Sequence, residues 1–249
     1  MRTPVMAGNW KMYKTPAETT AFFEKFRPLV EKSEHCEIVI CPPFTNLGAA
    51  VDAVKGTRVC VGAQNIAWAR EGAFTGEVSG PMLVAVGATH AIVGHSERRQ
   101  YFGETDETVL KRTKAALEAG LTPIVCVGER LEDREHGATK TVLTAQFTKG
   151  IAGLTVDQFA KIVIAYEPVW AIGTGKTATP EMAAEAHRMI RGQVWAKYGS
   201  GPATSVRILY GGSVKPDNVK SLMAQPEIDG VLVGGASLDP VGFASIVNF

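Results

Sequence analysis

The chain lacks a strong charge of either sign and any long apolar run. Its 249 residues carry 26 Lys and Arg against 25 Asp and Glu, a formal net charge of +1. Nothing therefore draws the whole molecule toward nucleic acid or an anionic membrane. No run approaches membrane-spanning length, and residues 1–8 lack the apolar core of a secretion signal. We expect a cytoplasmic protein with no nucleic-acid or membrane partner, in which local groups hold any anionic ligand.

Cysteine is scarce and widely spaced. Cys36, Cys41, Cys60 and Cys126 form no C-x-x-C pair and have no paired histidines nearby in sequence. We therefore predict no metal site, and small buried thiols in a reducing compartment. Low-complexity linkers and charge blocks are also missing, so the sequence predicts a single domain over residues 1–249.

Short runs rich in β-branched residues recur along the chain, each followed by a segment that suits a helix. The runs are residues 5–9, 37–41, 58–62, 91–94, 123–127, 162–166, 207–210 and 230–233. Eight units in this length give about 31 residues per unit, the size of one strand–helix step. This alternation predicts an α/β protein with a closed (β/α)₈ barrel. An open doubly wound sheet is the alternative, but it usually needs a glycine-rich turn after the first strand, where residues 9–12 read Asn-Trp-Lys-Met.

The helical segments differ in clarity. Residues 16–32 begin after Thr15, a suitable cap, and have Pro16 in the first turn. Residues 105–119 and 180–198 also favour helices, and the weakest prediction is the short segment 80–86.

In a barrel of this kind, functional side chains gather where strands end on the carboxyl-terminal face. The residues after the predicted strands are Asn9, Lys11, Gln64, Asn65, His95, Ser96, Glu97, Glu167, Gly211, Gly212, Ser213, Gly234 and Gly235. They bring an amide, an ammonium, an imidazole, a carboxylate and two glycine-rich turns to one face.

Glu167 is the most informative of these residues. It ends an apolar run, and Pro168 then forces the chain out of the sheet. Partial desolvation at the rim of an apolar core raises the pKa of a carboxyl group, which suits a general base. A strand-end glutamate in a surface ion pair is equally compatible with this stretch.

His95 and Lys11 each have two interpretations. His95 precedes a helical segment, so it is either a simple cap or an imidazole whose pKa the helix dipole lowers, leaving a neutral N–H donor. Lys11, beside Asn9, is either a surface lysine or a counter-charge for an anionic substrate. The other histidines are interpreted as structural, and Glu129 with residues 130–135 as a solvated charged face.

Glycines mark a possible phosphate site and a lid. The turns at 210–213 and 233–236 follow the last two strands, where backbone amides and a short helix bind phosphate in barrels. Residues 168–178 suit a lid that grips phosphate, with Gly173 presenting an N–H group. Residues 175–177, Gly-Lys-Thr, resemble the end of a nucleotide-binding loop, but the first glycine of that motif would fall at Trp170.

The segment 64–79 is long for a connection without secondary structure. It carries Trp68 and Phe74 beside glycines. We expect it to dock into a second copy of the chain, with folding back onto its own barrel as the alternative.

Five stretches of the chain closely resemble the triosephosphate isomerase family. They are residues 7–12 (AGNWKM), 72–77 (GAFTGE), 93–99 (VGHSERR), 165–175 (AYEPVWAIGTG) and 210–213 (YGGS). The resemblance covers the whole chain with every motif in order. It implies a cofactor-free aldose–ketose isomerase that interconverts dihydroxyacetone phosphate and D-glyceraldehyde 3-phosphate through an enediolate, and a homodimer joined through 64–79. Tyr13 departs from the asparagine common after Lys-Met in bacterial members.

The resemblance also implies roles for individual residues. Glu167 would be the base and neutral His95 the electrophile, a known assignment in that family. Asn9 and Lys11 would stabilise the oxyanion and attract phosphate. Phosphate would bind N–H groups of Gly173, Ser213, Gly234 and Gly235, while Ile172 and Leu232 would cover the base. Two other functions stay open: an aldolase using Lys11 as Schiff-base nucleophile, and a phosphate-binding module without activity.

Overall fold

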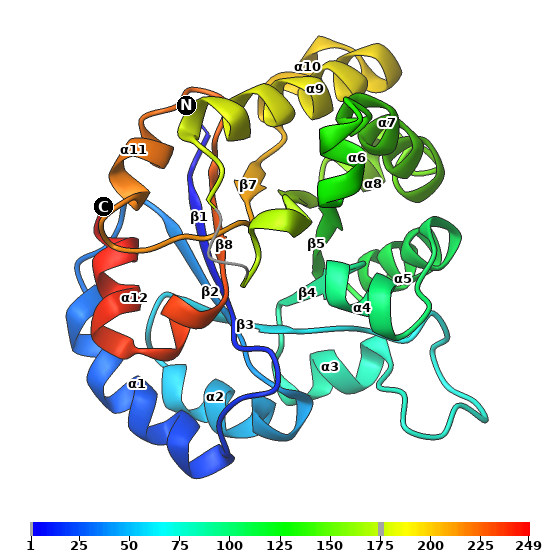
Figure 1. The fold of residues 1–249 in the computed structure, drawn as a ribbon. Helices are drawn as coiled ribbons and strands as arrows, with labels where there is room; N and C mark the ends of the chain where they lie inside the picture. The colour runs from blue at the N-terminus through cyan, green and yellow to red at the C-terminus, as the bar shows by residue number, and fades with distance from the viewer. Residues whose placement is uncertain (1, 174–176) are drawn as a thin grey trace.

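The computed structural model describes residues 2–173 and 177–249 of the chain. Eight parallel strands pair in chain order and close into a barrel, because the last strand pairs with the first (Figure 1). The strands are β1 (Val5–Asn9), β2 (Glu37–Cys41), β3 (Val59–Ala63), β4 (His90–Val93), β5 (Thr122–Val127), β6 (Val163–Tyr166), β7 (Ile208–Tyr210) and β8 (Gly230–Val233). The predicted (β/α)₈ barrel is confirmed, and the doubly wound alternative is wrong because the sheet has no open edge.

Helices surround the barrel on its outer side (Figure 1). The described α-helices are α1 (Pro16–Val30), α2 (Leu47–Val54), α3 (Gly80–Val86), α4 (Ser96–Tyr101), α5 (Asp106–Glu118), α6 (Leu131–Glu135), α7 (Thr139–Gly150), α8 (Val156–Phe159), α9 (Pro180–Tyr198), α10 (Ser200–Ser205), α11 (Val219–Met223) and α12 (Pro240–Val247). Short 3₁₀ turns are η1 (Phe44–Asn46), η2 (Val169–Ala171) and η3 (Gly235–Leu238). None of the helices in the described part of the chain has both the length and the apolar character needed to cross a bilayer.

Local sequence explains where α1 begins. The Thr15 hydroxyl accepts a hydrogen bond from the Glu18 amide, and the Glu18 carboxylate accepts one from the Thr15 amide at 2.7 Å. This reciprocal pair satisfies two backbone donors at the helix start. The helix ends at Val30 rather than at the predicted residue 32, whereas α9 and α3 have the predicted bounds.

Alternate residues of each strand face two different cores. On β1, Val5 and Ala7 join a cluster inside the barrel, whereas Met6 packs in the larger cluster between strands and helices. This period of two follows from the pleat of a strand. Because both faces are buried, the strands read as continuous apolar runs in the sequence.

Candidate active site

A cavity of about 290 Å³ opens at the carboxyl-terminal ends of the strands. Its lining residues are Asn9, Lys11, His95, Glu167, Ile172, Gly173, Gly211, Gly212, Ser213, Val214, Lys215, Leu232, Gly234, Gly235 and Ala236. The residues expected to act in catalysis or substrate binding, from Asn9 to Gly235, therefore lie at this cavity, whereas the strand-end residues Gln64, Asn65, Ser96 and Glu97 are not part of its lining. Lys215 also lines the cavity, but it carries no signal in the sequence because it lies two residues beyond the glycine turn rather than at a strand end.

Glu167 follows β6 directly and is only 2% exposed. One carboxylate oxygen, Oε2, accepts a hydrogen bond from the Ser96 amide at 2.8 Å, and the other, Oε1, lies 2.8 Å from His95 Nε2. The Glu167 amide donates to the Val127 carbonyl oxygen at 2.7 Å, which ties the end of β6 to β5. The interpretation as a surface ion pair is therefore wrong, because both partners of this carboxylate are buried groups of the β4–α4 junction.

His95 is the N-cap residue of α4 and is 6% exposed. Its Nδ1 atom accepts a hydrogen bond from the Glu97 amide at 3.2 Å. An imidazole nitrogen that accepts an N–H bond carries no proton of its own, so we assign the ring proton to Nε2, the atom facing Glu167. The interpretation of His95 as a helix cap is therefore confirmed, and the same bond leaves the N–H group at Nε2, whereas the expected lowering of the pKa is not found.

The pKa values of this pair shift in the directions opposite to those expected from the sequence. Burial disfavours the charged form of Glu167, but the nearby His95 and the Ser96 amide outweigh it, so the pKa of Glu167 is lowered. Burial likewise disfavours the imidazolium, but the charge and hydrogen bond of Glu167 outweigh it, so the pKa of His95 is raised. Both expectations failed for one reason: the structure places these two groups in direct contact.

Lys11 has an unusual backbone. Its φ angle is +54°, in the left-handed region that residues other than glycine rarely adopt. Asn9 Oδ1 accepts a hydrogen bond from the Lys11 amide at 3.0 Å, and Gln64 Nε2 donates one to the Lys11 carbonyl oxygen at 2.8 Å. The ammonium group forms an ion pair with Glu97 Oε1 at 2.6 Å. A strained backbone conformation persists where neighbouring groups hold it in place. Here the bonds from Asn9 and Gln64 keep the ammonium group of Lys11 at the cavity wall.

Glycine is required on the side of the cavity near the base. A Cβ atom on Gly211 would lie 3.0 Å from the Glu167 side chain, and one on Gly212 would lie 2.2 Å from the Tyr210 hydroxyl. A Cβ on Gly234 would lie 3.6 Å from Lys11 Cε. The two turns therefore bring backbone close to both Glu167 and Lys11, as a small anionic ligand requires.

The prediction that Glu129 belongs to a solvated charged face with residues 130–135 is wrong for Glu129. Its side chain is fully buried, and Oε1 accepts hydrogen bonds from the Tyr166 hydroxyl and from Trp170 Nε1, both at 2.9 Å. Arg134 lies 3.4 Å from the same oxygen. Glu129 thus anchors Trp170, near the start of the expected 168–178 lid.

Part of that expected lid cannot be described. Residues 174–176 lie outside the described residues, and they include the Gly175 and Lys176 of the nucleotide-binding alternative. Of the described lid residues, Ile172 and Gly173 line the cavity. Gly173 has a φ angle of +69°, a conformation that favours glycine.

Fold and site together define a class of protein, the (β/α)₈ barrels with a cavity of ionisable side chains at the carboxyl-terminal face. The family model for triosephosphate isomerase matches residues 4–249. The chain therefore belongs to the triosephosphate isomerase family, which is a family of isomerases.

Curated relatives agree over the full length. The chain is 81% identical to triosephosphate isomerase of Solibacter usitatus over 249 residues, covering all of both proteins. It is 57% identical to the enzyme of Citrifermentans bemidjiense and 56% identical to that of Geotalea uraniireducens, covering all of this chain and 99% of each relative.

Proposed function

We propose that the protein interconverts dihydroxyacetone phosphate and D-glyceraldehyde 3-phosphate, moving a proton between adjacent carbons through an enediolate. The observation that carries this proposal is the contact between Glu167 and His95, 2.8 Å apart in a cavity that also holds Lys11. Such a site offers a base for the carbon-bound proton, a donor for the carbonyl oxygen and a cation for developing negative charge.

Substrate entry would reverse the two pKa shifts. A substrate lying between Glu167 and His95 separates them and removes the interactions that lower one pKa and raise the other. Burial then dominates at both groups, raising the pKa of the carboxyl group and lowering that of the imidazole. Glu167 thereby becomes a stronger base as substrate binds, and His95 stays neutral while its Nε2–H group polarises the carbonyl.

Asn9 and Lys11 would stabilise the oxygen atoms of the enediolate. Lys11 is already held at the cavity wall by Asn9 and Gln64, so little reorganisation is needed when charge develops. The ion pair with Glu97 competes with the substrate for the ammonium group. Because Lys11 and His95 supply the electrophilic groups, the proposed reaction needs no cofactor.

The phosphate group would bind backbone amides of Gly173, Ser213, Gly234 and Gly235. The last of these begins η3, and the amino ends of helices favour anions. Among the described residues other than the chain neighbours, no atom lies within 4 Å of a Cβ built on Gly235 or on Gly173, which leaves space for a ligand. Closure of residues 168–178 would exclude water and bring Ile172 toward Leu232 over Glu167.

A coupled assay tests the proposal directly. Purified protein is incubated with dihydroxyacetone phosphate, and glyceraldehyde 3-phosphate is detected with a dehydrogenase, before and after dialysis against a chelator. We expect turnover under both conditions. Borohydride added with substrate separates an aldolase, which would gain covalent mass at Lys11. Absence of product, or turnover lost with the chelator, would contradict the proposal.

The segment 64–79 supports a further part of the proposal, a homodimer. It projects from the edge of the barrel between β3 and α3 (Figure 1). Its aromatic rings, Trp68 and Phe74, are 44% and 42% exposed and pack edge to face with centroids 5.5 Å apart. Arg112 lies over the Trp68 ring at 4.9 Å, so the loop is supported on its own barrel while still presenting apolar surface.

Light scattering after size exclusion tests the dimer. We expect twice the chain mass of 26.6 kDa for the protein and a shift toward monomer for Phe74→Asp. Val156→Asp is the matched control, since Val156 is an exposed apolar residue on α8. A monomeric protein, or an equal shift in both variants, would refute the role of the loop.

A further inference from the structure

Three potential metal ligands meet at the amino-terminal end of the barrel, opposite the active site. Glu37 is the first residue of β2, Cys60 lies on β3, and His90 is the first residue of β4. Each residue offers one ligand atom: a carboxylate oxygen, a thiol sulfur and an imidazole nitrogen. These three atoms lie within 4.8 Å of one another. The residues are far apart in sequence, so spacing alone could not show this cluster.

The imidazole of His90 turns its Nε2 atom toward the cluster. His90 is 4% exposed, and Thr89 Oγ1 lies 2.9 Å from its Nδ1 atom. Metal binding requires the tautomer in which Nδ1 carries the ring proton and faces Thr89. The lone pair of Nε2 then faces Glu37 and Cys60.

A carboxylate oxygen faces this nitrogen at close range. Glu37 Oε1 lies 3.1 Å from His90 Nε2, and the hydrogen bond and charge of His90, with those of Arg207, lower the pKa of Glu37 to about 2. With a proton on Nε2 the two atoms form an ion pair, and with the proton on Nδ1 they are two acceptors that a cation between them would join. In a tetrahedral zinc site, bonds of about 2.1 Å place nitrogen and oxygen ligands about 3.4 Å apart. The observed separation is close to that value.

We propose that Glu37, Cys60 and His90 form a binding site for a divalent transition metal ion of the zinc type, distinct from the active site. A thiolate, an imidazole and a carboxylate are the ligands that such ions prefer, whereas magnesium and calcium prefer oxygen alone. On binding, the Cys60 thiol forms a bond from sulfur to the metal and releases one proton to solvent. The fourth position is open to water, because Glu37 and Cys60 are partly exposed. The ion would link β2, β3 and β4.

One neighbour opposes the ion. Arg207 Nη1 forms an ion pair with the second oxygen of Glu37 at 2.5 Å, so a positive charge already lies beside the site. Arg207 therefore weakens binding without occupying the position between Glu37 and His90. Replacing it should tighten the site, an effect that a purely structural cluster would not show.

Cobalt(II) is the probe for the experiment, because a cobalt–thiolate bond gives a charge-transfer absorption. The reduced, metal-free protein is titrated with cobalt(II) and then with zinc(II). We expect one ion per chain, release of one proton, a higher melting temperature with zinc, and loss of the absorption when zinc displaces cobalt. Cys60→Ser should abolish the band, His90→Gln should weaken binding at least about tenfold, and Arg207→Gln should strengthen it.

Matched variants separate this site from other thiols and histidines. Cys36→Ser removes another buried thiol, and His136→Gln removes an exposed histidine. Both should bind cobalt like the unmodified protein. The melting curve of each variant without metal shows that it is folded. A band that survives in Cys60→Ser, an equal loss in Cys36→Ser, or no band at one equivalent would overturn the proposal.

Discussion

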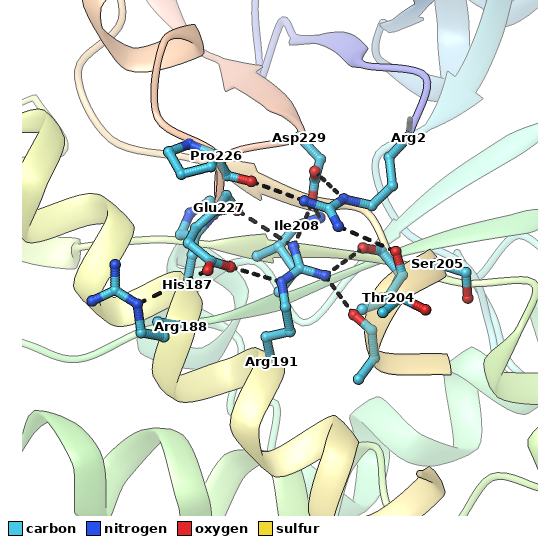
Figure 2. Close-up of polar contacts among 12 residues, drawn as sticks. Arg2, His187, Arg188, Arg191, Thr204, Ser205, Ile208, Pro226, Glu227 and Asp229 are labelled. Carbon is cyan, nitrogen blue, oxygen red and sulfur yellow. Dashed lines mark hydrogen bonds and ion pairs between the residues drawn. The ribbon is translucent and has the colours of Figure 1, made fainter. Parts of the chain in front are cut away.

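The two ends of the barrel each bury a carboxylate, and they partner it in different ways. Asp229, just before β8, contacts the guanidinium groups of Arg2 and Arg191 and accepts the Ile208 amide at 2.9 Å (Figure 2). Glu167, just after β6, has His95 and one backbone amide. Arginine is always charged, whereas an imidazole changes its charge near neutral pH. The carboxylate at the amino-terminal end is therefore locked, and the one at the active site can be released.

The network around Arg191 shows what locking requires. This α9 side chain reaches Glu227 at 2.8 Å and Asp229 at 2.7 Å (Figure 2). It also donates to the carbonyl oxygens of Ala203 and Val206, and thus joins α9 and α10 to the segment before β8. The cavity beside Glu167 has open space where a ligand can replace protein partners. If the proposed function is right, one end serves stability and the other serves chemistry.

The largest expected effect is the loss of activity in Glu167→Gln. The amide can still accept the Ser96 N–H bond but cannot take a proton, so we expect kcat to fall at least about 10³-fold with little change in melting temperature. Glu135→Gln, at an exposed glutamate of α6, is the control and should keep full activity. Steady-state kinetics and thermal melting measure both. Full turnover in Glu167→Gln would remove the assigned base.

Asp229→Asn should lose stability and keep activity. The substitution removes the buried charge between Arg2 and Arg191 and leaves Arg191 only the partly exposed Glu227, so we expect the free energy of unfolding to fall by about 3 kcal/mol while kcat hardly changes. Urea unfolding at one fixed protein concentration measures the loss. Asp52→Asn breaks an exposed pair with Lys55 and should have little effect. If kcat drops while stability is unchanged, the division between the two ends is wrong.

His187 makes the amino-terminal end sensitive to acid. It is fully buried beside Glu227, and burial lowers its pKa from 6.5 to about 4. In the unfolded chain His187 gains a proton as the pH falls through 6.5. In the folded protein the same imidazole stays neutral until about pH 4. Stability is therefore lost within this window as the pH decreases, by at most about 3 kcal/mol.

Urea unfolding at several pH values between 7 and 4 tests this contribution. In His187→Gln the loss of stability toward low pH should be smaller than in the unmodified protein, whatever the stability of the variant at pH 7. Replacing exposed His136 by Gln is the control. Parallel pH profiles for His187→Gln and the unmodified protein would contradict the assignment.

The smallest effect should come from Gln146, which acts on the active site through the backbone. Its side chain binds both the amide and the carbonyl of Gly128, at 2.7 and 3.0 Å. Gly128 lies so close to the Glu167 backbone that a Cβ atom would be 1.7 Å from the Glu167 carbonyl oxygen. We expect Gln146→Ala to lower kcat about tenfold, equivalent to roughly 1.4 kcal/mol, with KM little changed.

Gln193→Ala provides the comparison for that variant. Gln193, on α9, donates to the Thr144 hydroxyl at 3.1 Å and is remote from the cavity lining. It should keep full activity. Equal kinetics in both variants would show that Gln146 does not position the base.

Strand positions were predictable because every strand is buried on both faces. The runs at 5–9, 37–41 and 230–233 have the predicted bounds, since turn residues flank them clearly. β3 is displaced by one residue, where Arg58 and Gly62 give a weaker boundary. The strand-end rule then identified Asn9, Lys11, His95 and Glu167 at the cavity but missed Lys215, because a closed parallel barrel brings the carboxyl-terminal strand ends to one face while the loops beyond them follow no such rule.

Charge environments were not predictable. Glu129 stands among charged neighbours in sequence, yet Tyr166 and Trp170, which are 37 and 41 residues away, bury it. The pKa shifts of Glu167 and His95 depend on the few ångströms between two side chains of different strands. The contacts of Glu129 and the distance between Glu167 and His95 cannot be deduced from neighbouring residues in the sequence.

Hydrophobic periodicity and turn residues act locally along the chain, so they were enough to predict the barrel and the face that carries the site. The polar groups that meet are set by the folded barrel: Glu167 with His95, Asp229 with Arg2 and Arg191, and Glu37 with Cys60 and His90. Coulomb energies and desolvation change over a few ångströms, so these pairings follow only from closure of the barrel in three dimensions.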